Sequence, residues 1–135
     1  KLIVLDHISF MVSNQKGDER KMLDEIAHNL KALTVELDIC LLAVSHTKRQ
    51  NTKPLEEGGQ TSLSDLRGTA GIGQLANIVV GLERNGQADD ERERHTTLLR
   101  VLKNRYSGLT GPTSYLHYDQ FTGRLSEVEE KEENV

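Results

Sequence analysis

Two short apolar runs with one amphipathic segment between them constrain the fold of this chain more than any other feature. The first run covers residues 2–5 (LIVL) and the second covers residues 39–44 (ICLLAV). Runs without polar alternation are typical of strands that are buried on both faces of a parallel sheet. Between them, residues 18–37 carry an apolar stripe at helical spacing, formed by Met22, Ile26, Leu30, Leu33 and Leu37. The sequence therefore predicts a strand–helix–strand unit with two parallel strands and a right-handed crossover.

The second half of the chain reads as short strands separated by turn residues. Strands are predicted at 78–83, 95–105 and 113–119, the last in a hairpin with the segment GRLSEV. We expect the first of these strands to run parallel to the N-terminal pair and the later ones to extend the sheet with antiparallel pairing. Residues 45–61 are polar and contain Gly, Pro and Lys, which predicts a long loop of the kind that often carries function.

Length and cysteine usage place the chain in a broad class. Its 135 residues are enough for one domain with a core. No apolar run approaches the roughly 18 residues of a membrane helix, so we expect no membrane partner. The single cysteine, Cys40, lies in the second apolar run, and we expect it to be buried. A lone thiol forms no disulfide framework and fits a reducing compartment.

The excess negative charge of the chain lies at the C-terminus. The chain has a net charge of −4, and residues 127–135 carry five Glu and one Lys, which accounts for all of it. Because the remaining body is balanced, net charge neither supports nor excludes a polyanionic partner. We predict a domain over residues 1–126 and a solvated, disordered acidic tail over residues 127–135.

A polar side chain follows each N-terminal strand near the point where the strand ends. Asp6 directly follows the first run, and His46 follows the second. The carboxyl ends of parallel strands meet at one edge of a sheet, where ligands bind, so we expect both side chains to face one crevice. A carboxylate held there can bind the water shell of Mg²⁺ on a nucleoside triphosphate, as in a Walker B segment. Both residue types are also common at loop starts without such a role, and the residues alone leave both interpretations open.

Basic residues gather at two further places. Lys48, Arg49 and Lys53 lie in the loop after His46, where mobile cations suit a phosphate backbone, although two nearby glutamates dilute the charge. Lys103 and Arg105 alternate at the end of a predicted strand and could point into one site. An arginine there could stabilise a transferring phosphoryl group or form an ordinary surface ion pair.

Five segments carry motifs in a fixed order: LIVLDHIS, GDERKMLDEIAHNLKALTVELDICLLAVSHTK, EEGG with SLSDLRGTAGIGQLANIVVGLERN, LKNRYSGLTG and YLHYDQFTGRL. Taken together, they resemble the C-terminal part of the RecA-like motor domain of DnaB-family replicative helicases. The branch that the chain resembles most is that of the phage primase–helicases and their mitochondrial relatives. The resemblance runs from Leu2 to about Leu125 and implies a partial RecA-like P-loop NTPase core of α/β class. That core runs from the Walker B strand onward, with a mostly parallel sheet and antiparallel C-terminal strands.

The resemblance implies a hexameric ring of identical subunits that hydrolyses ATP or dTTP with Mg²⁺, moves along single-stranded DNA and unwinds duplex DNA. Asp6 matches the Walker B aspartate and metal ligand, and His46 matches the residue that senses the γ-phosphate. Arg105 matches the arginine finger that reaches the adjacent subunit, with Lys103 beside it. The residues that sandwich the nucleotide base are matched by Arg84 and Tyr118.

The resemblance places DNA contacts in two segments. The first is the loop over residues 47–60, with Lys48 and Lys53 as the foremost phosphate contacts and Arg49 between them. The second is LRGTAGIGQ, which in the family lines the channel and couples it to the nucleotide. Its residues here include Arg67, Gly68 and Gln74. In the phage branch a basic residue precedes that glutamine, whereas this chain has Gly73, so one DNA contact is absent.

The phosphate-binding motif GxxxxGK[ST] does not occur in the sequence. The family's catalytic glutamate also precedes the Walker B strand, so we expect the chain to begin inside a motor domain and to be inactive alone. The alternatives are a non-enzymatic module that binds DNA or caps a ring, and a RecA-type recombinase ATPase. The segments LRG…QL and LKNRYSG favour the helicase. In similar phage helicases an acidic C-terminus docks the polymerase, so the resemblance offers a polymerase contact as the alternative to a purely solvated tail. We expect the protein to lie in the cytoplasm, that of a bacterial host if it is phage-encoded.

Overall fold

The computed structural model of this chain describes residues 1–13, 16–48, 53–66 and 70–128. The chain divides into two compact units. The N-terminal unit comprises Lys1–Lys48 and Leu63–Ala76, and the C-terminal unit comprises Arg49–Ser62 and Asn77–Val135. The loop that follows the second strand therefore contributes residues to both units.

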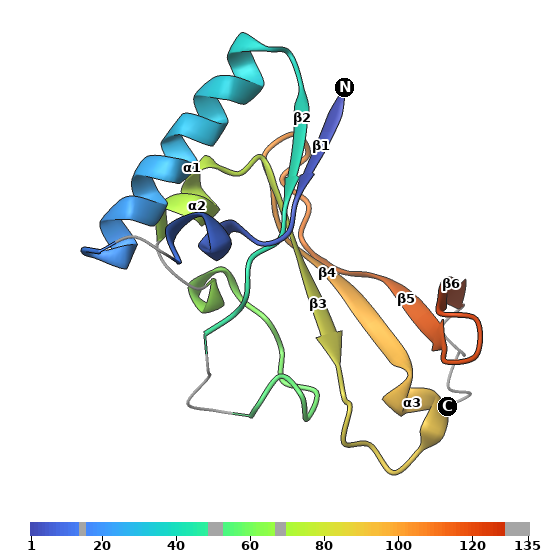
Figure 1. The fold of residues 1–135 in the computed structure, drawn as a ribbon. Coiled ribbons are helices and arrows are strands. Elements are labelled where there is room, and N and C mark those ends of the chain that lie inside the picture. The colour runs from blue at the N-terminus through green and yellow to red at the C-terminus, as the bar shows by residue number, and fades with distance from the viewer. Residues whose placement is uncertain (14–15, 49–52, 67–69, 129–135) are drawn as a thin grey trace. The chain divides into compact units, whose positions relative to one another are not determined.

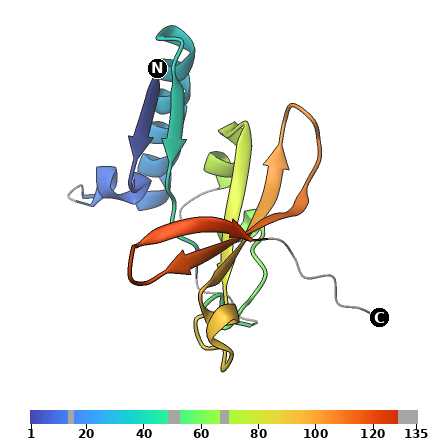
Figure 2. The same cartoon turned by 90° about the vertical axis from the view of Figure 1, so that its right-hand side faces the viewer.

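The N-terminal unit contains the predicted strand–helix–strand arrangement. Strands β1 (Leu2–Leu5) and β2 (Cys40–Ala43) pair in parallel, with Leu2 opposite Cys40. Helix α1 (Glu19–Glu36) connects them and runs alongside the strand pair in Figures 1 and 2. The parallel pairing and the helix predicted from periodicity are thus confirmed.

Helix α1 begins and ends at residues that satisfy its free backbone groups. The Asp18 side chain accepts a hydrogen bond from the amide of Arg20 at 3.0 Å, which makes Asp18 the N-cap. At the other end, Asp38 has a φ of +48°, and the amide of Ile39 donates to the carbonyl of Thr34 at 3.1 Å. This is the Schellman arrangement, in which one left-handed residue reverses the chain and feeds it into β2.

The core of the N-terminal unit lies between α1 and a short 3-10 helix, η1 (Ile8–Val12). Leu23 of α1 is fully buried and packs with Ile8 and Val12. Ile72 of helix α2 (Ala70–Leu75) joins the edge of this cluster. The apolar stripe of α1 is therefore used to bury the segment that directly follows β1.

The expected burial of β1 and β2 is wrong. Leu2 is 63% exposed, Val4 is 59% exposed and Leu42 is 57% exposed, and Cys40 is exposed as well. The physical reason is the size of the sheet. Among the described residues these two strands pair only with each other, and the core cluster covers only the end of β1.

The C-terminal unit is built on a four-stranded antiparallel sheet in the order β3-β4-β5-β6. The predicted strands and the C-terminal hairpin are confirmed, and Figure 2 shows the β5–β6 hairpin turned well away from the direction of β3. Such a twist is the usual right-handed habit of strands. The bounds are β3 (Ile78–Arg84), β4 (Thr96–Asn104), β5 (Gly111–Asp119) and β6 (Arg124–Val128).

The antiparallel pairing expected for the later strands is confirmed, and among the described strand pairs β3 lies in their sheet and not in the sheet of β1 and β2. β3 pairs antiparallel with β4, with Arg84 opposite Thr97. The connection between them is short and contains only the one-turn helix α3 (Glu91–Arg94). A parallel neighbour needs a crossover of about a dozen residues or more, so a short return produces an antiparallel pair.

Within the described part of the chain, no helix combines the length and apolar character required to cross a membrane.

Candidate functional site

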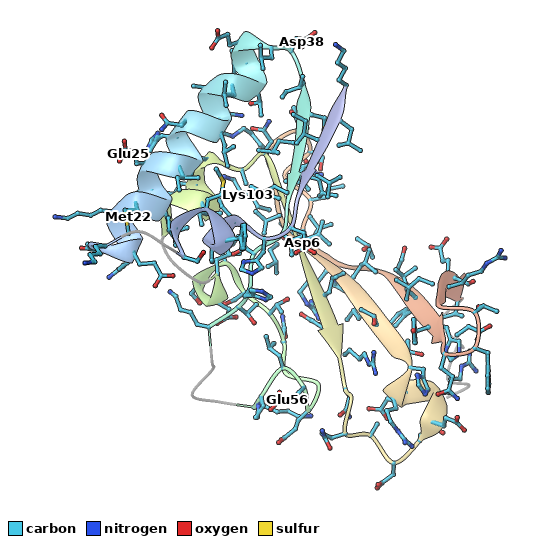
Figure 3. The ribbon with its side chains drawn as sticks, in the orientation of Figure 1. Asp6, Met22, Glu25, Asp38, Glu56 and Lys103 are labelled. Carbon is cyan, nitrogen blue, oxygen red and sulfur yellow. The ribbon has the colours of Figure 1, made fainter. Side chains whose placement is uncertain are left out.

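The ends of β1 and β2 lie side by side, as the sequence predicted. The amide of Val44 donates to the carbonyl of Leu5 at 2.9 Å, and the amide of Ile8 donates to the carbonyl of Val44 at 3.0 Å. These bonds extend the pairing past the strands and bring the segment after β1 against the segment before His46. Figure 3 labels Asp6 at this point, where its carboxylate is exposed.

His7 is a neighbour of His46 that the sequence analysis did not single out. The two imidazole rings lie edge to face, with their centroids 4.4 Å apart. The Nδ1 atom of His7 is buried and has no hydrogen-bond partner among the described residues. His7 therefore fixes one side of His46 by ring packing. The signal that could have revealed it is its place in the sequence, directly after Asp6.

The number of possible metal ligands around Asp6 indicates which kind of metal site this residue can form. No group of three or more His, Cys, Asp or Glu residues in the described ranges is arranged to hold a metal ion. Mg²⁺ usually keeps several waters and is held by one or two carboxylates together with substrate phosphates. A single exposed carboxylate at the end of a strand fits that kind of binding and does not fit a closed metal site.

The loop after His46 is tied down at its start. Thr47 forms a β-bridge with Leu66, and the amide of Lys48 donates to the carbonyl of Asp65 at 2.7 Å. The Lys48 ammonium also donates to the carbonyl of Ser64 at 3.3 Å. These partners lie in the short 3-10 helix η2 (Leu63–Asp65) or directly after it, and Lys48 belongs with them to the N-terminal unit. Lys53 is exposed and belongs to the C-terminal unit, and Arg49 lies outside the described residues.

The segment LRGTAGIGQ is only partly described. Arg67 and Gly68 lie outside the described residues, whereas Gln74 is exposed on α2. The neighbouring Gly73 is buried, and a Cβ atom there would lie 3.2 Å from a methyl of Leu66. A long basic side chain would have to displace that leucine or turn away from it. The close approach of α2 to the segment before it explains why glycine suits this position.

Arg105 lies in a turn immediately after β4. The side-chain oxygen of Asn104 accepts hydrogen bonds from the amides of Tyr106 at 3.0 Å and Ser107 at 3.2 Å, which makes an Asx turn. Gly108 closes the turn with a φ of +72° and donates to the carbonyl of Asn104 at 2.9 Å. Arg105 is thereby exposed at the corner of an ordered turn.

The structure does not keep Lys103 and Arg105 on one strand. Lys103 is the last residue but one of β4 and pairs with Val79 of β3, whereas Arg105 lies beyond the strand. Strand alternation therefore no longer determines which way Arg105 points. The turn residues, Asn104 above all, determine it instead.

The two residues predicted to hold a nucleotide base contact neighbouring residues. Arg84 Nε donates to the carbonyl of Arg94 at 2.8 Å. The Tyr118 ring stacks on His95 with a centroid distance of 6.4 Å, and its amide donates to the carbonyl of His95 at 2.8 Å. Both side chains thus meet the C-terminal end of α3, and both come from the same end of the sheet.

Beside Tyr118 lies an open hollow of about 560 Å³. His95 and His117 face each other across part of it, with ring centroids 6.1 Å apart. Asp119 also lines the hollow, and its pKa lies below the usual range because the Thr122 hydroxyl and the amides of Phe121 and Thr122 donate hydrogen bonds to it. The aromatic and imidazole rings of this hollow, with polar groups such as Asp119 beside them, can stack on a flat, partly polar ligand.

The sequence of this chain matches the model of a known protein family. The model of the DnaB-like helicase C terminal domain matches residues 1–126. This chain belongs to that family. The "DNA helicase/primase" of Enterobacteria phage T3 is 40% identical over 126 residues, which are 92% of this chain and 22% of that protein. The "Replicative DNA helicase DnaB" of Mycobacterium leprae (strain TN) is 28% identical over 126 residues, 90% of this chain and 20% of that protein.

A comparison with solved structures agrees on the fold of this DnaB-like chain. It superimposes with a TM-score of 0.77 on a protein described as "The Structure Of A DnaB-Like Replicative Helicase And Its Interactions With Primase". The match covers 95% of this chain and 31% of the other, at 23% identity. The RecA-like α/β fold expected from the sequence is thus confirmed. The chain spans only about a fifth of the length of the curated relatives it matches.

Proposed function

We propose that this chain is the C-terminal part of the motor domain of a replicative DNA helicase, driven by nucleoside triphosphate hydrolysis. The observation that carries the proposal is the family match over residues 1–126. The paired ends of β1 and β2 support it, because they hold Asp6 and His46 at one edge of the parallel strands, which is where such folds bind ligands. Residues 1–126 work as part of one motor domain, with residues 127–135 as an acidic tail.

The nucleotide is ATP or dTTP with Mg²⁺. Asp6 would hold the metal through its water shell, and the metal would supply charge neutralisation at the phosphates when bound. His46, held against His7, is placed to read the γ-phosphate position and to pass its state to the loop that follows it. Gln74 of α2 lies in the same unit and would report the same state. Since the sequence has no GxxxxGK[ST], we propose that this chain alone does not hydrolyse nucleotide.

Arg105 acts on the nucleotide of an adjacent, identical subunit in a hexameric ring. Its exposed position on an ordered turn suits a group that must leave its own subunit to act. Lys103 would support it from β4. Arg84 and Tyr118 would contact the base, and their shared contact with the end of α3 keeps both at one end of the sheet.

Single-stranded DNA is the partner that fits the basic loop. Lys48 and Lys53 would contact phosphates, together with Arg49, Arg67 and Gly68, which lie outside the described residues. Phosphate contacts of this kind release counterions, so binding should weaken steeply with salt. The acidic tail would bind the replicative polymerase, and deletion of residues 127–135 with undiminished polymerase binding would contradict that part. The protein would work in the cytoplasm, that of a bacterial host if it is encoded by a phage.

The test is nucleotide hydrolysis by the full-length polypeptide that carries these residues, with and without single-stranded DNA. We expect DNA-stimulated turnover, and a loss on the order of 10³-fold in Arg105→Ala if this residue stabilises the transferring phosphoryl group. Arg124→Ala is the matched control, because Arg124 is an exposed arginine on β6 of the same sheet. Turnover that changes neither with DNA nor with the Arg105→Ala substitution would contradict a ring motor. It would favour a non-enzymatic module that binds DNA or caps a ring.

A further inference from the structure

Glu83 of β3 is a buried carboxylate with an unusual set of partners. It is 8% exposed. Arg100 of β4 donates from Nε at 2.7 Å to one carboxylate oxygen and from Nη2 at 3.1 Å to the other. The amide and the hydroxyl of Thr61 each donate to Oε1 at 2.7 Å. A buried charge needs such pairing, since an unpaired one would be costly.

These partners keep Glu83 ionised. Burial raises the pKa of Glu83, but the hydrogen bonds from Arg100 and Thr61 outweigh it and leave the pKa below its ordinary value of 4.5. Arg100 lies opposite Gly81, two residues from Glu83 along β3, so the pair is a diagonal cross-strand pair. Thr61 is different, because it belongs to the loop that follows His46 and not to the sheet.

Thr61 can reach Glu83 because β3 has a glycine beside it. A Cβ atom on Gly81 would clash with the hydroxyl oxygen of Thr61. The absence of a side chain at Gly81 therefore creates the space in which Thr61, itself only 4% exposed, lies against the strand. The contact therefore depends on the backbone of β3 at Gly81 as well as on the side chains of Thr61 and Glu83.

Residues 53–61, here called the loop arm, form a compact turn that ends at Thr61. The amides of Glu57 and Gly59 both donate to the carbonyl of Pro54, each at 3.0 Å. Gly59 lies so close to the carbonyl of Lys53 that a Cβ atom there could not be accommodated. The backbone of Lys53 is therefore fixed relative to Gly59, and Gly59 is two residues from the anchor at Thr61.

The loop arm has a second attachment, to Asn85, which directly follows β3. Glu57 forms a β-bridge with Asn85, and a Cβ atom on Gly58 would lie 3.2 Å from that of Asn85. The arm is thus held on both sides of Arg84, by Glu83 and by Asn85. All of these residues belong to the C-terminal unit.

We propose that Glu83 is a positioning residue for DNA binding: it anchors the loop arm on β3 through Thr61 and thereby sets the place of Lys53 against the phosphate backbone. Arg100 holds the carboxylate in the orientation that accepts from Thr61. This inference rests on the proposed function, because it assumes that Lys53 contacts single-stranded DNA. It also means that β3 both carries Arg84 and holds the loop arm in place.

The central test uses Thr61→Val in the full-length polypeptide, because this change removes the hydroxyl donor and leaves the Glu83–Arg100 pair in place. We expect the affinity for a single-stranded oligonucleotide to fall about tenfold, the scale of one hydrogen bond to a charged group. Thr61→Ser keeps the hydroxyl and should restore wild-type affinity. Thr113→Val is the matched control, since its exposed hydroxyl donates to the carbonyl of Leu99 at 3.1 Å in the same sheet.

A double-mutant cycle separates positioning from a general loss of stability. Lys53→Ala should weaken DNA binding in the wild type and have much less effect in Thr61→Val, because a loose arm no longer places the lysine. Amide hydrogen exchange gives a readout that needs no DNA. Peptides covering residues 55–63 should exchange about tenfold faster in Thr61→Val, while those of the β4–β5 hairpin should keep wild-type rates.

Two failures can be told apart. If the wild type binds no single-stranded DNA, the proposed function fails, and the assignment of Lys53 fails with it. If the wild type binds DNA but Thr61→Val keeps wild-type affinity, wild-type exchange in the arm and the full effect of Lys53→Ala, the positioning role is overturned. Glu83→Gln is a supporting variant, and a failure of it to fold leaves the Thr61 comparison intact.

Discussion

The backbone amide of Arg105 donates to the carbonyl oxygen of Asn77 at 2.8 Å, which ties the turn after β4 to the residue that precedes β3. The same asparagine donates from its side chain to the hydroxyl of Tyr106 at 3.0 Å. Asn77 thus holds two consecutive residues of the turn, and Asn104 caps it from the other side. If Arg105 acts on an adjacent subunit, as proposed, such a base favours that action, because less freedom is lost when the arginine binds.

The first prediction concerns this turn. Asn104→Ala removes the acceptor for the amides of Tyr106 and Ser107, so Arg105 should sample more positions. We expect the maximal rate of DNA-stimulated hydrolysis by the full-length polypeptide to fall about tenfold, with the KM for nucleotide nearly unchanged. Asn104→Asp keeps an acceptor and is the control. Equal rates for Asn104→Ala and wild type would show that the turn does not limit Arg105.

The second prediction concerns the pair of histidines. His7→Ala removes the ring that packs against His46, and we expect DNA stimulation of turnover to fall by about two- to tenfold, the scale of an aromatic contact. His7→Phe keeps a ring and should retain most of the stimulation. The measurement is the ratio of turnover with DNA to turnover without it. The same ratio in His7→Ala as in His7→Phe would contradict the role of the His7 ring.

The third prediction is a pH dependence of stability. The pKa of Glu83 is lower in the folded chain than its ordinary value of 4.5, so the unfolded chain binds the proton more readily. The stability that Glu83 contributes is therefore present above about pH 4.5 and is lost as the pH falls through the folded pKa. Melting temperatures of the full-length polypeptide between about pH 6 and pH 3 should decline less steeply for Glu83→Gln than for wild type. Parallel curves would contradict the prediction.

The fourth prediction uses the end of α1. Asp38 has a left-handed backbone, with a φ of +48°, which disfavours every residue with a Cβ atom. Asp38→Gly should raise the free energy of unfolding by about 0.5–1 kcal/mol, since the relief of strain exceeds the added freedom of the unfolded chain. Asp24→Gly, a change inside the same helix, should lower it. Urea denaturation of the full-length polypeptide measures both, and a destabilised Asp38→Gly would contradict the prediction that the Cβ atom of Asp38 strains this left-handed position.

The fifth prediction concerns the isolated chain. Val4 and Leu42 are more than half exposed on a sheet of two strands, which is a surface prone to association. Residues 1–135 expressed alone should aggregate or melt without cooperativity. Val4→Thr combined with Leu42→Thr should reduce the aggregation measured by light scattering. A soluble monomer with a sharp, reversible melt would contradict this expectation.

Much of the fold could be predicted because it depends on local pattern. The apolar stripe predicted α1 nearly to its bounds, and short strands with turn residues between them predicted the C-terminal hairpins. The position of Asp6 directly after a strand was predicted in the same way, because it depends on adjacent residues. The pattern could not show that β3 belongs to the four-stranded sheet and not to the sheet of β1 and β2, because composition within a strand does not state which neighbour it meets. Burial of Cys40 was wrong because apolar character does not state what covers a strand.

The sequence by itself determined the order of strands and helices, the strand-end positions of Asp6 and His46 and the family, because each depends on residues close together along the chain or on motifs in order. Only the tertiary structure decided that Thr61 meets Glu83, that His7 packs on His46 and that β1 and β2 stay exposed. Contacts between distant residues depend on which surfaces the folded backbone brings together, and no local pattern of side chains specifies them.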